Sequence, residues 1–203
     1  GTIQFSVLTS PTVALQVGKN LNLYRTPGLG YVTLQLNARV APLNKLDVRL
    51  AIQCAINRAE VVKTAASGEA KVVGPITSPA YASDPNDRPC PNVDLAKTKK
   101  YLADAGYADG LTIKAIVSPT QYATASGTAQ NLKAQLAKVG INLELDILDN
   151  ATYVSRWLAG DFAAAVANNG GRIDPDTMYT RYFPSTGNLN KVAGYSSATM
   201  DAL

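Results

Sequence analysis

Hydrophobic and polar positions along the chain predict a series of β-strands. Apolar residues take every second position in Tyr31 to Asn37, in Leu111 to Val117 and in Ile141 to Leu148. This alternation places the apolar side chains of a strand on one of its faces. Phe162 to Ala167 is a short apolar run and a fourth strand candidate, and residues 2–8 are also strand-like.

Between these stretches, apolar residues recur with the period of a helix. The longest such pattern is PLNKLDVRLAIQCAINRAEVVKTAASG, from Pro42 to Gly68, and it predicts one helix. Asn44 is the expected N-cap of that helix, because its side chain can accept from the first free amide groups. Residues 12–19 predict a short helix near the start of the chain.

Three more helices are predicted in the second half of the chain. The first follows Asp94 as its N-cap, with Leu95, Thr98 and Leu102 on the inner face. The second opens at Ser126 or Thr128 and ends at Gly140. The third follows Asn150 as its N-cap, and Trp157 and Leu158 are its expected core anchors.

Regular alternation of helix and strand from Asp94 to Ala167 predicts right-handed βαβ crossovers. The fold class is therefore α/β, with a mostly parallel sheet flanked by helices. The turns at 118–124, 149–150 and 168–174 should then share one edge of the sheet, where open α/β sheets bind ligands. The predicted ligand-binding residues in the first and third turns are Gln121, Tyr122, Asn168, Asn169, Gly170, Gly171 and Arg172.

The third of these turns admits other interpretations. Its glycines could serve only to permit positive φ, and its asparagines could simply turn the chain. It is not a phosphate loop, because the Lys-Ser/Thr pair is missing. Asp174 and Asp176, with Tyr122, are the groups that a hydrolase would use. We favour Asp174 as the N-cap of a helix starting at Pro175, because carboxylates two residues apart there do not face each other.

Composition narrows the functions that these residues can serve. The 203-residue chain is 46% hydrophobic and 17% charged, as in globular proteins. It has no histidine, which excludes Ser-His-Asp and Cys-His catalysis and histidine-based metal sites. The net charge is +4, with Lys and Arg scattered along the chain, so no nucleic-acid footprint is present. We expect neither a cofactor nor a metal.

The two cysteines and the ends of the chain leave other questions open. Cys54 and Cys90 are either free thiols or one disulfide, which would stabilise the folded state by roughly 3 to 4 kcal/mol in the loop-entropy account.

No stretch of the chain reaches the ~18 consecutive apolar residues that a membrane span needs. The N-terminus lacks the features of a signal peptide, and the last residues read like the opening of a helix. We therefore expect a piece of a longer protein.

The chain contains several motifs in a fixed order, namely PLNKLDVRLAIQCAINRAEVV, GPI, DLAKTKKYLADAGYADGLTI, AQLAKVGINLEL, WLAGDFAAAV and IDPDTM. Together they resemble family 5 of the bacterial ABC-transporter solute-binding proteins, the peptide, dipeptide and nickel-binding group. The resemblance implies a type II, cluster C binding protein, whose two lobes close over a solute without catalysis. Residues 1–30 would be a hinge-side segment belonging to or adjoining the other lobe, and residues 31–203 the C-terminal ligand-binding lobe.

The resemblance also implies partners and a compartment. The solute-loaded protein would dock, as a monomer, on an ABC permease in the membrane. It would be periplasmic, or extracytoplasmic with a lipid anchor, and such a compartment favours a disulfide between Cys54 and Cys90.

For the solute, the informative positions are Asn168 and Gly171. Peptide-binding members carry a Trp and then an Asp there, and that Asp holds the α-amino group of the peptide. The chain lacks this charged anchor. The solute could be peptide-like, and a modified peptide, an oligosaccharide or an opine is the alternative.

Overall fold

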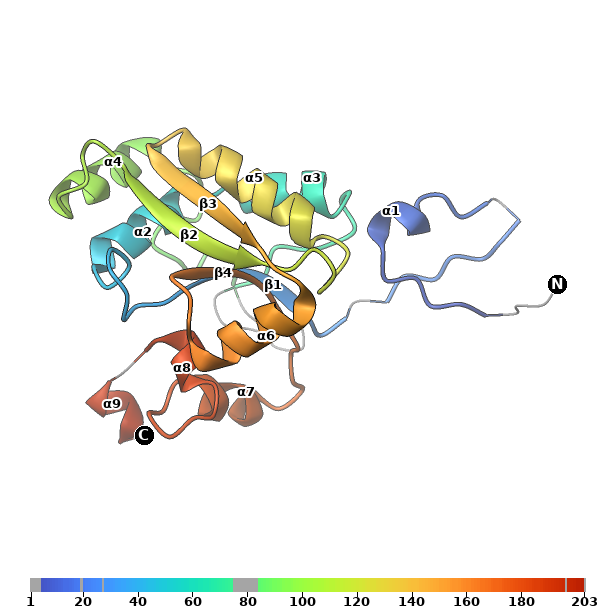
Figure 1. The fold of residues 1–203 in the computed structure, drawn as a ribbon. Helices are drawn as coiled ribbons and strands as arrows, with labels where there is room; N and C mark the ends of the chain where they lie inside the picture. The colour runs from blue at the N-terminus through green and yellow to red at the C-terminus, as the bar shows by residue number, and fades with distance from the viewer. Residues whose placement is uncertain (1–4, 19, 27, 75–83, 196, 203) are drawn as a thin grey trace.

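A four-stranded sheet in the order β1-β4-β2-β3 lies at the centre of the computed structural model (Figure 1). The structure describes residues 5–18, 20–26, 28–74, 84–195 and 197–202. The strands are β1 (Tyr31–Leu36), β2 (Leu111–Val117), β3 (Ile141–Ile147) and β4 (Ala164–Asn169). β2 pairs in parallel with both β3 and β4, and β1 pairs antiparallel with β4. The predicted α/β fold with a mostly parallel sheet is confirmed.

The three parallel strands are joined by helices in the βαβ manner. α5 (Ala125–Ala137) connects β2 to β3, and α6 (Asn150–Ala159) connects β3 to β4. The carboxyl ends of β2, β3 and β4 therefore share one edge of the sheet. The turns that follow these strands meet at this edge, as the sequence predicts; we call it the carboxyl edge.

Helices cover both faces of the sheet and give the lobe three layers (Figure 1). One layer contains α2 (Leu46–Ala55), α3 (Arg58–Ala65), α4 (Leu95–Asp104) and α5. The other contains α6, α7 (Pro175–Tyr182) and α8 (Asn190–Ala193), followed by α9 (Ala198–Asp201). Each layer has its own core: Leu132, Leu136 and Ile113 are buried in the first, and Tyr153, Met178 and Val192 in the second.

The longest helical pattern forms two helices, so the prediction of one continuous helix is wrong. α2 ends at Ala55, and the next residue, Ile56, is extended with φ −93° and ψ 119°. Asn57 then starts α3, because its side chain accepts from the Glu60 amide at 3.0 Å. The expected cap Asn44 is also wrong: α2 starts after Lys45, which makes no capping bond.

Helix boundaries elsewhere differ in smaller ways. Asp94 caps α4 as predicted, accepting from the Lys97 amide at 2.8 Å. α6 is capped by Asp149 instead of Asn150, because the Asp149 carboxylate accepts from both the amide and the hydroxyl of Thr152. α5 begins at Ala125, just after Thr124, which is one residue before the predicted start Ser126 and three before the alternative Thr128.

The sequence placed two leucines in the core that are in fact exposed, because each lies in a terminal turn of its helix. Leu95 lies in the first turn of its helix and is 43% exposed, and Leu158 lies in the last turn of α6 and is 51% exposed. Thr98 and Leu102 are buried as predicted. The main anchor of α6 is Tyr153, which is fully buried, while Trp157 is half-buried against the same cluster.

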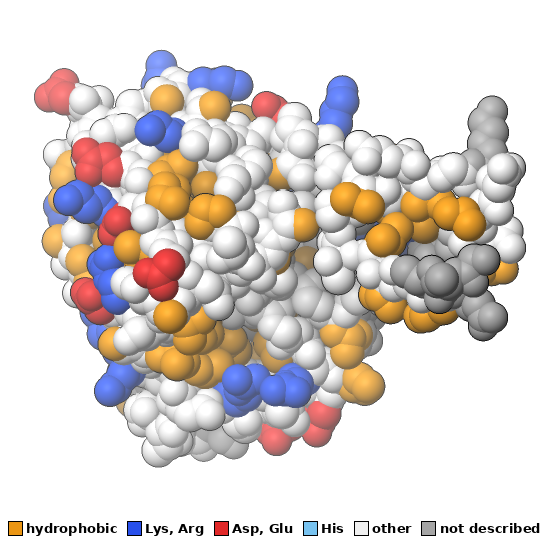
Figure 2. Space-filling model, turned by 45° about the vertical axis from the view of Figure 1, so that its right-hand side comes forward, with side chains coloured by type: hydrophobic (Ala, Val, Ile, Leu, Met, Phe, Trp, Pro, Cys, Tyr) orange, Lys and Arg blue, Asp and Glu red, His pale blue; other side chains and the backbone are white. Residues whose placement is uncertain are grey.

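The chain before β1 projects from the lobe on the side toward which the arrows of β2 and β3 point (Figure 1). In its described residues it contains one short helix, α1 (Pro11–Ala14), which overlaps the predicted stretch 12–19 but begins one residue before it and ends earlier. Residues 5–8 form no strand, contrary to prediction, and residues 1–4 lie outside the described residues. Apolar side chains gather on this segment (Figure 2), and Phe5 and Tyr24 are 82% and 85% exposed.

Cys54 and Cys90 form a disulfide, which resolves the choice that the sequence left open. Cys54 lies in α2 and Cys90 in the proline-rich loop before α4, and both are buried. The Asp94 amide also donates to the Cys54 carbonyl at 3.0 Å. The loop is thus fixed to the helix covalently and through the backbone.

Candidate ligand-binding site

Gln121 and Tyr122 lie in the turn between β2 and α5, at the carboxyl edge. Both residues are half-buried. The Gln121 Oε1 and the Tyr122 hydroxyl are nevertheless buried, and neither has a hydrogen-bond partner among the described residues. Burial, with a smaller contribution from Tyr153, raises the pKa of Tyr122. An unpaired buried polar atom costs free energy, so this turn holds hydrogen-bonding capacity that the lobe itself does not use.

Asn168 and Asn169 belong to β4 and not to the turn after it. The strand continues because these two residues pair with Val32 and Tyr31 of β1. Their side chains differ, since Asn168 is exposed and Asn169 is 3% exposed. The Asn169 Oδ1 accepts from the Tyr182 hydroxyl at 3.1 Å, whereas its Nδ2 is buried without a partner in the described part of the chain.

The turn from β4 to α7 carries the remaining predicted residues. Gly170 and Arg172 are exposed, and Gly171 is half-buried. Burial raises the pKa of Tyr182, and the nearby charges of Arg181 and Arg172 oppose that shift. The charge of Arg172 therefore acts on the pKa of Tyr182, the residue that donates to Asn169.

Asp174 is the N-cap of α7, as the favoured interpretation predicts. Its Oδ1 accepts from the Asp176 amide at 3.0 Å, and Pro175 occupies the first helical position. The Asp174 carboxylate therefore has a structural role as a helix cap. The two carboxylates of the hydrolase alternative lie at one exposed helix start.

The seven predicted residues lie at one edge of the sheet but in two groups. Tyr122 packs against the core on the α2 and α5 face, while the Tyr182 partner of Asn169 belongs to the core on the α6 and α7 face. Tyr153 belongs to the same core as Tyr182, and its hydroxyl donates to the Val166 carbonyl at 3.0 Å. Burial raises the pKa of Tyr153 to about 12, and Gln121 partly opposes the shift.

Sequence reasoning missed three residues of this edge, namely Tyr153, Tyr182 and Gly30. A Cβ at Gly30 would lie 3.2 Å from the Asn168 Oδ1, so the chain approaches the site closely where it begins β1. Tyr182 follows Met178 at a helical spacing of four, which could have placed both on the inner face of α7. Tyr153 precedes the predicted core anchor Trp157 by the same spacing of four, which could have placed it on the inner face of α6.

The chemistry available at this edge is mainly neutral hydrogen bonding. Gln121 offers an acceptor, Asn169 a donor and Tyr122 a group that can do either. Arg172 adds an exposed positive charge. Within the described ranges, no group of three Cys, Asp or Glu side chains could hold a metal ion. In the same residues, no helix is long and apolar enough to cross a membrane.

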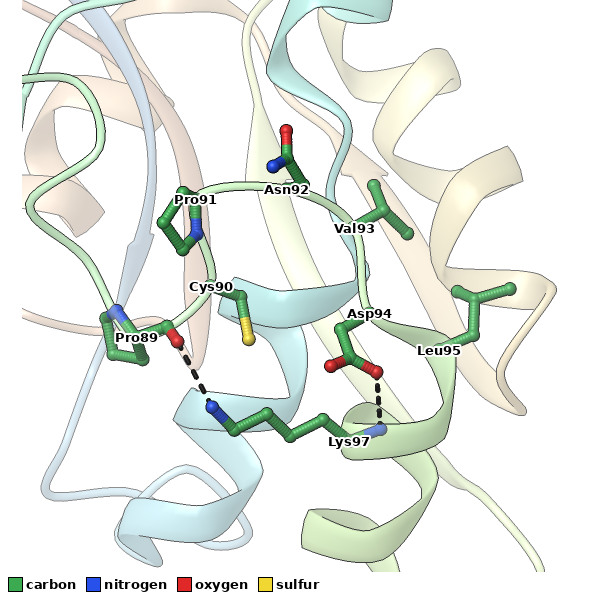
Figure 3. A pocket seen from close by; sticks show the side chains of 8 residues that line it. All are labelled: Pro89, Cys90, Pro91, Asn92, Val93, Asp94, Leu95 and Lys97. Carbon is green, nitrogen blue, oxygen red and sulfur yellow. Dashed lines mark hydrogen bonds between the residues drawn. The ribbon is translucent and has the colours of Figure 1, made fainter.

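Two surface depressions of the lobe lie away from the carboxyl edge. One is lined by residues from Pro89 to Lys97, beside the disulfide (Figure 3). There Lys97 reaches back to the Pro89 carbonyl at 3.3 Å. A second adjoins it and extends to the start of α3. Neither is lined by any of the seven predicted residues.

Comparison with known proteins agrees with this architecture. The chain is 30% identical to the glutathione-binding protein GsiB of Salmonella choleraesuis (strain SC-B67) over 184 residues, covering 90% of this chain and 34% of that protein. It thus spans about a third of the length of the curated relatives it matches.

Two solved structures have the same fold. The periplasmic binding protein DppA from Helicobacter pylori, in complex with the peptide STSA, matches with a TM-score of 0.73 and 29% identity over 86% of this chain and 35% of that one. AgaA from A. tumefaciens R10, in complex with agropinic acid, matches with a TM-score of 0.71 and 27% identity over 84% and 35%.

The resemblance seen in the sequence motifs is therefore confirmed by independent comparisons. The parallel sheet with helices on both faces matches the lobes of cluster C solute-binding proteins. Residues 1–190 match the family described as bacterial extracellular solute-binding proteins, family 5 Middle. This chain belongs to the bacterial extracellular solute-binding proteins of family 5.

Proposed function

We propose that this lobe forms one wall of a cleft in which an ABC importer's binding protein captures a small polar solute. The observation that carries the proposal is the set of three buried, unpaired polar atoms on Gln121, Tyr122 and Asn169 at the carboxyl edge. A solute that bonds to them would recover the free energy lost by their burial. The role is binding and delivery to a permease, without catalysis.

The opposite wall would come from the rest of the protein. We assign residues 1–30 to the hinge side, belonging to or adjoining the other lobe, and residues 31–203 to the C-terminal lobe. The exposed apolar side chains between Phe5 and Leu29 support this division, because a covering lobe would bury them. The whole protein would work as a monomer outside the cytoplasmic membrane, either free or held by a lipid anchor.

The preferred solute is peptide-like, and its binding does not depend on a carboxylate that holds a free α-amino group. No acidic side chain lies among the seven site residues, and Asp174 is engaged as a helix cap. Similarity to a glutathione-binding protein and to a complex with the peptide STSA supports a peptide-like class.

A second candidate is a non-peptide solute that carries a carboxylate, such as an opine. Arg172, exposed at the carboxyl edge, is the observation that favours it, because a guanidinium pairs well with a carboxylate. The similarity to AgaA, solved with agropinic acid, adds support. An oligosaccharide would use the neutral groups of the site and not Arg172.

Calorimetric titration of the full-length protein tests these proposals. The panel consists of glutathione, short peptides with free and with acetylated N-termini, opines and oligosaccharides. We expect binding in the peptide-like class, with acetylation changing the affinity by no more than about threefold. A loss of a hundredfold on acetylation would contradict the proposed recognition, and absence of binding across all classes would contradict the function itself.

A matched pair of variants connects the binding to the site. Tyr122→Phe removes only the unpaired hydroxyl and should weaken the solute about tenfold, the effect of one lost hydrogen bond. Tyr107→Phe is the control, since Tyr107 lies beyond α4 at the opposite edge of the sheet, before β2 begins. Equal affinities for the two variants would remove Tyr122 from the site.

A further inference from the structure

A depression of about 480 Å³ lies between the start of α3 and the loop that precedes α4. The polar side chains that line it are Asn57, Arg58, Asn86, Arg88 and Asn92. α3 runs antiparallel to α5, since the Asn57 amide bonds to Gln135 while Ala65 lies against Gly127. The start of α3 therefore lies beside the C-terminal end of α5, on the side of the lobe remote from the carboxyl edge. This depression is separate from the proposed solute site.

Two guanidinium groups line the depression, and the described residues satisfy only part of their donors. Arg58 donates to the carbonyls of Ile56 and Gln53 and to the Gln53 side chain. Within the same residues, Arg88 donates once, to the Val73 carbonyl at 2.7 Å. A guanidinium has five N–H donors. The Nε of Arg88 is buried and has no partner in the part of the chain that the structure describes.

In the described part of the chain, no acidic side chain forms an ion pair with either guanidinium. The ion pairs among the described residues join Arg25, Lys100 and Arg156 to acids, and none includes Arg58 or Arg88. Burial, and then the charge of Arg88, lower the pKa of Arg58 to about 10, so it stays protonated at neutral pH.

Three acids lie close in the sequence to the residues that line the depression, although none of them lines it. Burial also lowers the pKa of Arg88, and the negative charge of Asp84 opposes that shift. Asp87 is exposed in the same loop, and Glu60 lies in the first turn of α3. These groups reduce the positive potential without pairing with either guanidinium at ion-pair distance.

We propose that this depression is a second binding site, which takes a small oxyanion of the phosphate or sulfate class between Arg58 and Arg88. An oxyanion there would accept from the Arg88 Nε and from the unused N–H groups of both guanidiniums. It would also neutralise two like charges that the fold holds together. Asn86 and Asn92 add carboxamide donors at the rim.

The test is a titration of the chain with inorganic phosphate and with sulfate at low ionic strength, followed by amide NMR shifts and calorimetry. Sodium chloride at matched ionic strength is the reference. We expect saturable shifts at Arg58, Ala59 and Arg88, and none that saturate at the carboxyl edge. Shifts that follow ionic strength alone would overturn the proposal, and so would shifts centred on the carboxyl edge.

Three variants sharpen this test. Arg88→Gln should weaken phosphate binding at least tenfold, whereas Lys99→Gln removes an exposed charge of α4 and should change it less than twofold. Asp84→Asn keeps the oxygen that accepts from the Asn86 amide but removes a negative charge, and should tighten binding two- to fivefold. Damage to the fold cannot produce this gain, so Asp84→Asn decides the matter even where Arg88→Gln unfolds the loop. Equal losses in Arg88→Gln and Lys99→Gln, or no gain in Asp84→Asn, would refute the site.

Discussion

Tyr122 and Tyr153 illustrate two different uses of a buried hydroxyl within one small region. The Tyr153 hydroxyl donates to the backbone of β4 and ties α6 to the sheet. The Tyr122 hydroxyl is buried without a partner in the described residues. One hydroxyl supports the fold, and we propose that the other bonds to the solute. Their effects on stability should therefore differ.

Removing each hydroxyl in turn measures this difference. Tyr153→Phe leaves the Val166 carbonyl without its side-chain donor in a fully buried position, and should lower the free energy of unfolding by about 1 to 2 kcal/mol. Tyr122→Phe loses no bond within the lobe and should stay within about 0.5 kcal/mol of the parent. Urea unfolding followed by circular dichroism gives both values. Destabilisation by Tyr122→Phe as large as that by Tyr153→Phe would show that Tyr122 is structural.

The sequence could predict where a candidate site residue lies only when the order of the strands alone determines its place at the edge of the sheet. Gln121 and Arg172 could be placed at the carboxyl edge because each follows a parallel strand. The burial of Asn169 could not, because its extension of β4 depends on pairing with Tyr31 of a distant segment. Long-range pairing of this kind leaves no local pattern in the sequence.

At the scale of elements, the pattern of apolar residues predicted the four strands of the sheet but not every helix start. Asp149 and Asn150 are both good N-cap residues, so sequence alone could not choose between them. The structure selects Asp149, whose carboxylate accepts two bonds from Thr152. The division at Ile56 was also hidden, because its apolar side chain continues the helical period of the residues before it.

The choice of cap for α6 can be tested with neighbouring substitutions. Asp149→Ala removes the acceptor for the Thr152 amide and should cost about 1 kcal/mol of unfolding free energy. Asn150→Ala changes the adjacent exposed residue and should cost less than about 0.5 kcal/mol. Chemical unfolding of the two variants side by side provides the comparison. A larger effect at Asn150 would restore the assignment made from the sequence.

At the scale of the whole molecule, the disulfide constrains the region where secondary structure is sparse. It closes a 36-residue separation between α2 and the loop before α4. Composition could not reveal the pairing, because two cysteines in a chain of this size are equally consistent with free thiols. The family resemblance favoured the disulfide through the compartment it implies, and the structure contains it.

Breaking this link should lower stability substantially. The double substitution Cys54→Ala and Cys90→Ala restores the freedom of the loop in the unfolded chain, and should lower the free energy of unfolding by about 3 to 4 kcal/mol. Equilibrium unfolding in urea measures the change. Dithiothreitol should have a similar effect on the parent protein and none on the double variant. A parent protein insensitive to reduction would contradict a stabilising role for the bond.

The antiparallel direction of β1 determines where the projecting segment joins the lobe. Tyr31 starts this strand opposite Asn169, and Gly30 approaches the Asn168 side chain, so the chain arrives directly beside the carboxyl edge, where we propose that the solute binds. Any body carried by that segment is tethered within a few residues of the site. A short tether of this kind gives the attached body a high effective concentration over the edge, and keeps the loss of entropy on closure small.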